Sequence, residues 1–306
     1  MNTVLVLLLF LLLLAIPLSA RRKLQRSRIL LVIPGIGKAK RLENVVLQLT
    51  KVFSVQLSTN PDINTRRDWD CISYIYADDD DDDFWVKSKK SVDELAILCE
   101  LVRWPGGQYS MFLKATVPTL LRRYTHIFVV MDDIIFQTES NTFDLQGFFD
   151  IAGRNNLTVA SPGITGSGLG FMYPSNNTHP EVEKRLAKRP MPAGTIGRIV
   201  NSVEIQATLF SFPSFRCFWS LLDLKRNYYG WYYDSYFYEF CREKVPGFKM
   251  GIVDSMEVYH GFGLGQTSSV HGNVKNQQAT DMEAWWLKHR GIELKKIRRA
   301  AIGYIT

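Results

Sequence analysis

The sequence has little of what marks the commonest metal-binding and nucleic-acid-binding proteins. It holds only four cysteines, and none forms a C-x-x-C pair, which argues against a zinc site. No RNA-recognition or zinc-finger signature occurs, so we expect no nucleic-acid partner. No internal repeat is visible along the 306 residues. What remains is an ordinary globular composition with enough apolar residues for a sizeable core.

The cysteines leave two alternatives open. They lie at positions 71, 99, 217 and 241. In an oxidising compartment they could form one or two disulfides, and four cysteines allow three complete pairings that the sequence cannot rank. Buried free thiols are an equally good interpretation.

No apolar run is long enough for a comfortable membrane span, which needs about 20 residues. The nearest is Val4–Leu18, followed by Ser19-Ala20 and then by the basic residues 21–23. This pattern fits the core and cleavage site of a signal peptide. We therefore predict a signal peptide or signal anchor over residues 1–20 and a short basic stem over 21–27.

The N-terminal segment and two possible glycosylation sites bear on the cellular compartment of the protein. Two sequons, at Asn156 and Asn176, are compatible with a lumenal body and predict N-glycosylation. Basic residues after the apolar run would instead favour a cytoplasmic body if the segment stayed in the membrane. We prefer the ER/Golgi lumen, with the chain either secreted after cleavage or held at the membrane as a single-pass protein.

The charge is uneven. The net charge is +7 although Asp78–Asp83 is an unbroken run of aspartates. A basic body favours phosphate-bearing partners such as nucleotide-sugars, though it does not choose among polyanions. The run lacks the alternating ligands and the glycine of an EF-hand, so we predict a solvated, self-repelling loop.

Strand-like and helix-like segments alternate along the chain. The pattern predicts strands at 28–33, 53–57, 71–76, 126–131, 157–161, 249–253 and 257–260, and helices at 39–52, 95–102, 109–123, 143–153, 215–224 and 232–241. We therefore predict an α/β fold, a mostly parallel central sheet flanked by helices, as one Rossmann-like domain over residues 28–275. A basic amphipathic helix is expected over 276–306. The Gly- and Pro-rich segment 163–197 is expected to be a surface excursion or flap.

Acidic residues and a histidine follow two of the predicted strands. Asp132 and Asp133 come directly after the strand at 126–131, and His260 ends the last one. Ligands of open α/β sheets bind beyond the carboxyl ends of the strands. Two carboxylates there suit a hard divalent cation, and an added imidazole suits Mn²⁺ better than Mg²⁺. The aspartates could equally cap a turn. Asp254, after the strand at 249–253, has the same ambiguity.

A second candidate site surrounds Gly230-Trp231-Tyr232-Tyr233-Asp234. Aromatic rings stack on sugar faces, and Asp234 could act as the general base toward an acceptor hydroxyl. A carboxylate favoured by the start of a helix is an equally good interpretation. The turn from Trp104 to Gly107 could present backbone N–H groups to an anion, although it lacks the spacing of a P-loop or a dinucleotide fingerprint.

Several of these stretches resemble an uncharacterised family often labelled "lysine-ketoglutarate reductase trans-splicing related". The resemblance rests on residues 203–206, 210–211, 216–217 and 219, then on Gly230-Trp231, Asp234, Cys241, 251–255 and His260. It covers about residues 29–260. The family shows an Asp-Glu-Asp triplet where this chain has Met131-Asp132-Asp133, so the first carboxylate is missing. If the triplet binds metal, Asp133 is the safer ligand.

The order of these parts is also similar to that of GT-A nucleotide-sugar transferases. The similarity implies Mn²⁺ (or Mg²⁺) on Asp133 and His260 with Asp132 in support, and Asp234 as base. It implies Trp231 as a platform for the acceptor. We also expect substrate contacts for Gly230, Glu204, Asp254 and Trp104. The expected function is metal-dependent, inverting hexosyl transfer from a nucleotide-sugar to a glycan or glycoprotein. The alternative is a non-catalytic carbohydrate-binding or scaffolding protein that keeps the fold.

Overall fold

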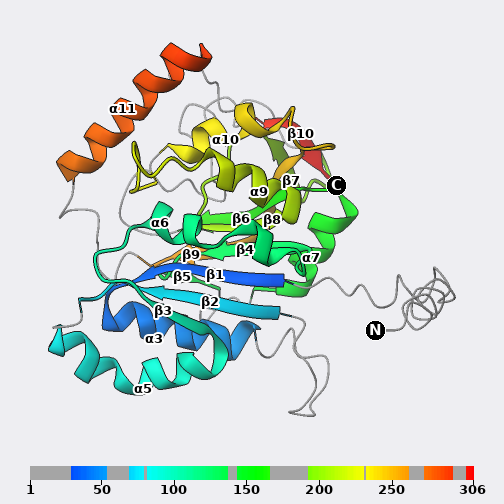
Figure 1. Cartoon of the computed structure of the whole chain (residues 1–306). Coiled ribbons are helices and arrows are strands. Elements are labelled where there is room, and N and C mark those ends of the chain that lie inside the picture. Colours follow the sequence, from blue (N-terminus) through cyan, green and yellow to red (C-terminus); the bar gives the residue numbers. More distant parts are fainter. Residues whose placement is uncertain are drawn as a thin grey trace, which may run out of the picture.

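The computed structural model describes residues 29–53, 69–78, 81–136, 143–165, 192–230, 232–261, 272–291 and 301–306, and a ten-stranded sheet runs through this part of the chain (Figure 1). In chain order the strands are β1 (Ile29–Ile36), β2 (Trp69–Ile75), β3 (Glu100–Arg103), β4 (His126–Val130), β5 (Ile134–Ile135), β6 (Val159–Thr165), β7 (Gly197–Val200), β8 (Ala207–Ser211), β9 (Met250–His260) and β10 (Ala301–Ile305). Across the sheet their order is β10-β7-β9-β6-β8-β4-β1-β2-β3, and β5 pairs with β9.

The sheet is mixed, and four neighbouring parallel strands come from the first half of the chain. Strands β3, β2, β1 and β4 are parallel neighbours, and β6 is parallel to β9. Strand β8 runs antiparallel between β4 and β6, and β7 and β10 extend the other edge antiparallel. The predicted α/β domain with a central sheet flanked by helices is confirmed.

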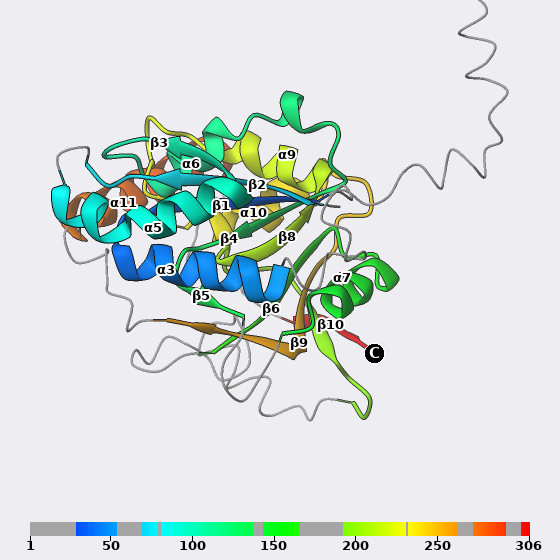
Figure 2. The ribbon, with the colours of Figure 1, turned by 90° about the horizontal axis from the view of Figure 1, so that it is seen from below.

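Helices cover both faces of the sheet (Figures 1 and 2). They are α3 (Ala39–Gln48), α5 (Asp82–Leu98), α6 (Tyr109–Ala115), α7 (Leu145–Arg154), α9 (Phe212–Leu221), α10 (Tyr233–Cys241) and α11 (Gly272–Arg290), with a π-helical turn at Leu49–Phe53 and a 3₁₀ turn at Pro118–Leu121. Helices α3, α5 and α7 contribute to the apolar cluster on one face. Helices α6, α9 and α10 contribute to the cluster on the other face.

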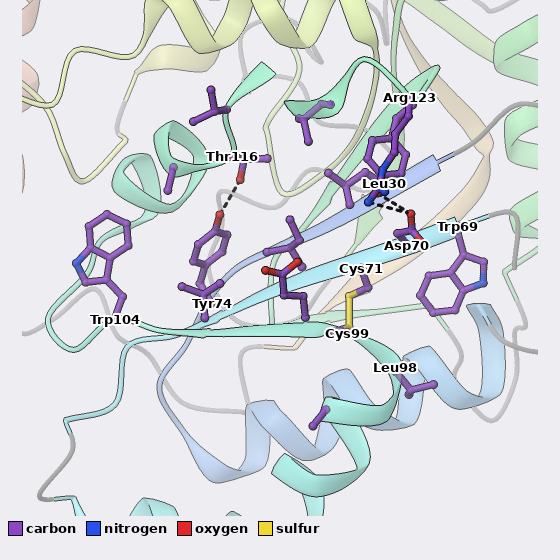
Figure 3. A pocket seen from close by; sticks show the side chains of 18 of the residues that line it. Leu30, Trp69, Asp70, Cys71, Tyr74, Leu98, Cys99, Trp104, Thr116 and Arg123 are labelled. Carbon is purple, nitrogen blue, oxygen red and sulfur yellow. Dashed lines mark hydrogen bonds and ion pairs between the residues drawn. A yellow bond between two sulfur atoms is a disulfide. The ribbon is translucent and has the colours of Figure 1, made fainter. Parts of the chain in front are cut away.

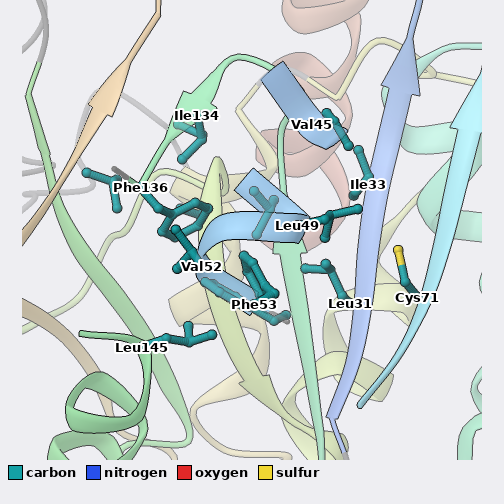
Figure 4. Close-up of a cluster of buried hydrophobic side chains, with 14 of the residues drawn as sticks. Leu31, Ile33, Val45, Leu49, Val52, Phe53, Cys71, Ile134, Phe136 and Leu145 are labelled. Atoms are coloured by element: carbon teal, nitrogen blue, oxygen red, sulfur yellow. The ribbon is translucent and has the colours of Figure 1, made fainter. Parts of the chain in front are cut away.

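The side chains of β1 point alternately to the two faces of the sheet, and this shows why helices must cover both faces. Leu31 and Ile33 pack into the α3 side of the core, next to Val45 and Leu49 (Figure 4). Leu30 and Val32 belong to the opposite cluster. Successive side chains of a strand point to opposite faces, so an unbroken apolar strand requires helices on both.

Several predicted boundaries differ from the structure. Phe53 was expected to open a strand but ends the π-helical turn, because its ring packs against Phe128 and Phe136. Residues 54–57 lie outside the described part. The strand expected to end at residue 161 continues through Pro162 and Gly163 to Thr165, and its pairing with β9 shifts register between those two residues. That shift lets β9 run unbroken where two strands were expected.

The end of the acidic run, Asp81–Asp83, caps and begins a helix, where a loop was expected. The Oδ1 atom of Asp81 accepts a hydrogen bond from the backbone N of Phe84 at 2.9 Å and so caps α5. Asp83, in the first turn, is ion-paired with Lys87. Negative charge at this end is favoured by the helix dipole. Helix α5 therefore starts well before the predicted position, and residues 100–102, expected as helix, belong to β3.

The C-terminal segment also differs from the expected single helix over 276–306. Helix α11 begins at Gly272 and ends at Arg290, and Ala301–Ile305 forms the edge strand β10 against β7. Ile305 is buried there, which gives the chain end an apolar anchor in the sheet.

The structure also distinguishes between disulfides and free thiols for the four cysteines. Cys71 is bonded to Cys99 and Cys217 to Cys241, so all four are disulfides. In the described residues no helix is long and apolar enough to cross a membrane. The predicted signal segment, the basic stem, most of the 163–197 excursion and Asn176 fall outside the described residues.

Candidate functional site

The predicted polar residues gather at one edge of the sheet. Because β1 to β4 are parallel, the segments that follow them meet at their common carboxyl edge. Asp132 and Asp133 follow β4 there, and Trp104 follows β3. His260 joins them through the antiparallel pairing of β5 with β9, in which Ile134 lies opposite His260.

Asp132 and Asp133 are buried and share one arginine. The Nη1 atom of Arg41, on α3, lies 2.7 Å from Oδ1 of Asp132, and its Nη2 atom lies 3.2 Å from Oδ2 of Asp133. The Nε2 atom of His260 lies 3.3 Å from the same Asp133 oxygen. The arginine is itself only 6% exposed, so one internal cation faces two carboxylates away from solvent. We refer to Asp132 and Asp133 as the acidic pair.

Helix α3 positions this arginine through further buried polar contacts. The side-chain amide of Asn44 donates to the carbonyl oxygens of Asp132 and Ile134, both at 3.0 Å. Gln48 accepts from the backbone N of Phe136 at 2.9 Å. With Arg41 these residues recur at helical spacing, on one face of α3. None of the three was predicted from the sequence. The available signal was three polar residues at helical spacing beside the apolar face of an amphipathic segment.

Burial and neighbouring charges shift the pKa values of the two carboxyl groups in opposite directions. Burial raises the pKa of Asp132 to about 7, and the nearby charge of Asp133 adds to this, while Arg41 opposes it. Burial also acts to raise the pKa of Asp133, but hydrogen bonding and charge from His260, together with the charge of Arg41, outweigh it and hold that pKa below its usual value. Oδ2 of Asp132 and Oδ1 of Asp133 have no hydrogen-bond partner among the described residues.

These residues do not fit the predicted resident Mn²⁺ as they are arranged here. Within the described part of the chain, no group of three or more His, Cys, Asp or Glu side chains is placed to hold a metal ion. The guanidinium of Arg41 already contacts both carboxylates, and His260 directs Nε2 at Asp133. A divalent cation would have to bind beside this fixed positive charge, which Coulomb repulsion disfavours.

The second predicted group lies around Gly230 and the start of α10. Gly230 has φ +94°, and its backbone N donates to Oδ1 of Asn227 at 2.9 Å. Two residues before it, the carbonyl oxygen of Tyr228 accepts a hydrogen bond from the backbone N of Ser110, on α6, at 3.1 Å. Asp234 is half-buried in the first turn of α10. Trp231 lies outside the described residues.

One short segment connects the two groups. The hydroxyl of Tyr109 donates to the carbonyl of Ile205 at 2.6 Å, and the next residue, Gln206, accepts from the backbone N of Met131 at 2.8 Å. Burial raises the pKa of Tyr109 far above its ordinary value, and the charge of Asp234 adds to the effect. Asp234 and the acidic pair are therefore connected through this segment.

The remaining predicted residues are placed separately. Asp254 forms a two-point ion pair with Arg198, with Nε to Oδ2 at 2.7 Å and Nη2 to Oδ1 at 2.6 Å. This ion pair connects β9 to β7. Glu204 is half-buried, and its carbonyl accepts from the hydroxyl of Thr208. Asn156 is exposed in the turn before β6, a position open to glycosylation.

Trp104 marks one end of a groove that the sequence did not indicate. A cavity of about 740 Å³ is lined by residues of β2 and β3, of the end of α5 and of the segment 115–124 (Figure 3). Tyr74 is hydrogen-bonded to Thr116 at 3.0 Å along it, and Asp70 accepts from the hydroxyl of Tyr124 at 2.6 Å. The cavity is lined by aromatic, apolar and polar groups. Trp104, at one end of it, follows β3 at the sheet edge that carries the acidic pair.

Gly230 gives a first testable expectation. A Cβ there would lie 2.6 Å from Cδ1 of Tyr109, and φ +94° is strained for any other residue. We expect Gly230→Ala to lower the free energy of unfolding by about 1–3 kcal/mol, measured by urea denaturation. Gly247→Ala is the matched control, because Gly247 also has positive φ but its added Cβ would meet nothing within 4 Å. Equal losses in both variants would show that the contact with Tyr109 is unimportant.

Comparison with known proteins agrees with this architecture. A family model described as "Protein of unknown function (DUF707)" matches residues 111–300, well over half of the chain. That description carries no trans-splicing label, so the predicted membership is supported and the label is not. The matched range contains the acidic pair, Asp234 and His260 but not Arg41. No curated protein matches the chain significantly.

Solved structures share the fold at low identity. A structure of GalNAc-T7 with UDP, GalNAc and Mn²⁺ is 10% identical with a TM-score of 0.50, over 87% of this chain and 56% of that one. Residues 1–349 of TarS from S. aureus give 8% identity and a TM-score of 0.42, over 86% and 74%. A nucleoside-diphosphate-sugar pyrophosphorylase from Vibrio cholerae gives 10% and 0.40, over 75% and 92%. The chain thus spans little more than half of the GalNAc-T7 chain, and the likeness to that structure establishes the GT-A fold alone.

Proposed function

Because this chain belongs to the DUF707 family and has a GT-A fold, we propose that it is a glycosyltransferase that uses a nucleotide-sugar donor in the secretory pathway. The observation that carries the proposal is the buried acidic pair at the carboxyl edge of the sheet, which the contacts of Tyr109, Ile205 and Gln206 connect to the start of α10, where Asp234 lies. Open α/β sheets bind ligands beyond the carboxyl ends of their strands. The similar GalNAc-T7 structure contains UDP and GalNAc, which motivates a nucleotide-sugar as the donor.

Asp234 is the proposed general base. It would take the proton of an acceptor hydroxyl while that oxygen bonds to the anomeric carbon of the donor sugar. The bond from that carbon to the diphosphate oxygen breaks at the same time, and the nucleoside diphosphate leaves. Attack from the opposite face inverts the anomeric configuration, as expected from the sequence. Trp104, Gly230 and Trp231 are proposed to contact the sugars, and contacts of Glu204 and Asp254 with substrate stay predictions.

The secretory location is supported by features separate from the site. The apolar segment Val4–Leu18 precedes a body with two disulfides, and disulfides persist in oxidising compartments. Asn156 is exposed, as an N-glycosylation acceptor must be. The acceptor is proposed to be a glycan or glycoprotein. The chain would be secreted or anchored at the ER/Golgi membrane, according to the fate of its first 20 residues.

Metal dependence was expected from the sequence, with Mn²⁺ or Mg²⁺ on Asp132, Asp133 and His260. Since Arg41 already binds both carboxylates, the proposed reaction contains no step through a metal ion at this pair.

The first test is thermal unfolding of the full chain with a panel of nucleoside diphosphates, each with Mn²⁺ or with EDTA. A ligand of the folded state raises stability by mass action, by about 2.7 kcal/mol at a concentration 100 times its dissociation constant. We expect one nucleotide to raise the melting temperature. A shift lost in EDTA would support the metal-dependent form, and one that persists in EDTA would support the form without metal.

A carbohydrate-binding scaffold is the second candidate. It is favoured by the neutralisation of the acidic pair by Arg41, which would leave a fold that no longer holds a donor. It predicts glycan binding that is indifferent to nucleotide and chelator. If no nucleoside diphosphate stabilises a well-folded sample while glycans do, this function replaces transfer.

A further inference from the structure

The acidic pair poses an electrostatic problem that Arg41 solves. Asp132 and Asp133 are adjacent in the chain and only 1% and 3% exposed. Two ionised carboxylates so close together and so far from water repel each other and lose their hydration. A nearby cation has to compensate them if both are to ionise. A divalent metal is one such cation, and a fixed guanidinium is another.

We propose that Arg41 is the built-in cation of this edge, taking the electrostatic place of a divalent metal, and that its removal would convert Asp132, Asp133 and His260 into a metal site. Arg41 bridges the pair, with one guanidinium nitrogen on each carboxylate, at 2.7 and 3.2 Å. A planar guanidinium suits such bridging better than a point charge does.

The surroundings hold Arg41 in this role. Asn44 and Gln48, on the same face of α3, bind backbone groups of Asp132, Ile134 and Phe136. The helix is therefore fixed to the segment that carries the carboxylates. The guanidinium cannot leave without breaking the ion pair while α3 stays in place. It is thus a permanent part of the fold rather than an exchangeable ion.

The ligands for a metal become available only when the arginine is absent. Oδ2 of Asp132 and Oδ1 of Asp133 have no hydrogen-bond partner among the described residues, and Arg41 occupies the other oxygen of each. His260 lies against Asp133. Two carboxylates and an imidazole form a donor set that suits Mn²⁺. Without Arg41, the positive charge that contacts both carboxylates would be gone.

A second buried arginine provides a matched control. Arg198 contacts Asp254 with equally short distances and is 2% exposed. It faces one carboxylate where Arg41 faces two. Removing either arginine leaves buried negative charge without its partner, which destabilises the fold. Only the Arg41 variant leaves two carboxylates and a histidine together.

The test measures Mn²⁺ binding by electron paramagnetic resonance and thermal unfolding of the full chain, with MnCl₂ or EDTA. For the wild type we expect a melting temperature that is the same in both. Arg41→Met should melt lower in EDTA, recover with Mn²⁺ and bind Mn²⁺ at least about tenfold more tightly than the wild type. Arg198→Met should melt lower without recovery.

Two results would overturn the inference. One is Mn²⁺ binding by the wild type that Asp133→Asn abolishes. The other is a folded Arg41→Met protein that ignores Mn²⁺. If Arg41→Met does not fold, Arg41→Met/Asp132→Asn, with one carboxylate charge fewer, should fold and still bind Mn²⁺ more tightly than the wild type, and failure to do so counts against the inference. The inference concerns the cofactor of the proposed function, but these measurements involve no nucleotide, so failure of nucleotide binding leaves it standing.

Discussion

Asp234→Asn is expected to lower the rate of glycosyl transfer by about 10²–10⁴-fold while the domain stays folded. Asparagine has nearly the same shape but cannot take the proton of an acceptor hydroxyl at neutral pH. The half-buried carboxylate opens α10, so its loss should cost only about 0.3–1 kcal/mol through the helix dipole. The rate is measured with the nucleotide-sugar whose nucleotide stabilises the chain, at saturating donor and acceptor.

Glu239→Gln is the matched control for this prediction. Glu239 lies on the same helix, is also half-buried and is ion-paired with Arg242. Its neutralisation should leave the rate within about twofold, because a surface ion pair contributes about 0–1 kcal/mol to stability and this one touches no proposed substrate. If Asp234→Asn retained full activity with normal nucleotide binding, another base would have to be sought at the same edge. If both variants lost activity equally, the effect would reflect displacement of α10 rather than base catalysis.

Phe128→Ala is expected to lower the free energy of unfolding by about 3–5 kcal/mol. Phe128 lies on the strand that leads to the acidic pair and is fully buried. Its ring centroid lies 5.9–6.1 Å from four other rings, those of Phe53, Phe136, Phe148 and Phe149. Removing it leaves a cavity that helices on one side and the sheet on the other cannot fill without breaking buried contacts. Urea denaturation followed by circular dichroism measures the loss.

Val86→Ala provides the comparison for this core prediction. Val86 lies on α5 and is 76% exposed, so we expect a change within about 0.5 kcal/mol. A loss below about 1.5 kcal/mol for Phe128→Ala would mean that the two layers close over the cavity. It would also mean that this aromatic cluster is less tightly packed than the structure indicates.

Periodicity located most of the fold because it reflects local burial. An unbroken apolar run such as β1 is stable only when both faces are covered, so the sequence pattern of that segment already requires a layered α/β domain. The same reasoning placed Asp132 and Asp133 at a strand end. The errors arose where local and tertiary preferences compete. Phe53 has a strand-like neighbourhood, yet its ring completes the helical side of an aromatic cluster.

The chain's own sequence was thus sufficient for the α/β class, the position of the acidic pair after a central strand, and Asp234 at the start of a helix. These depend on residues close together in the chain. The tertiary structure alone decided which cysteines pair, that residues 301–305 join the sheet, and that Arg41 neutralises the acidic pair. Each of these is a contact between segments far apart in sequence, 91 residues in the case of Arg41 and Asp132. The free energy of such a contact depends on burial and on partners that no local pattern encodes.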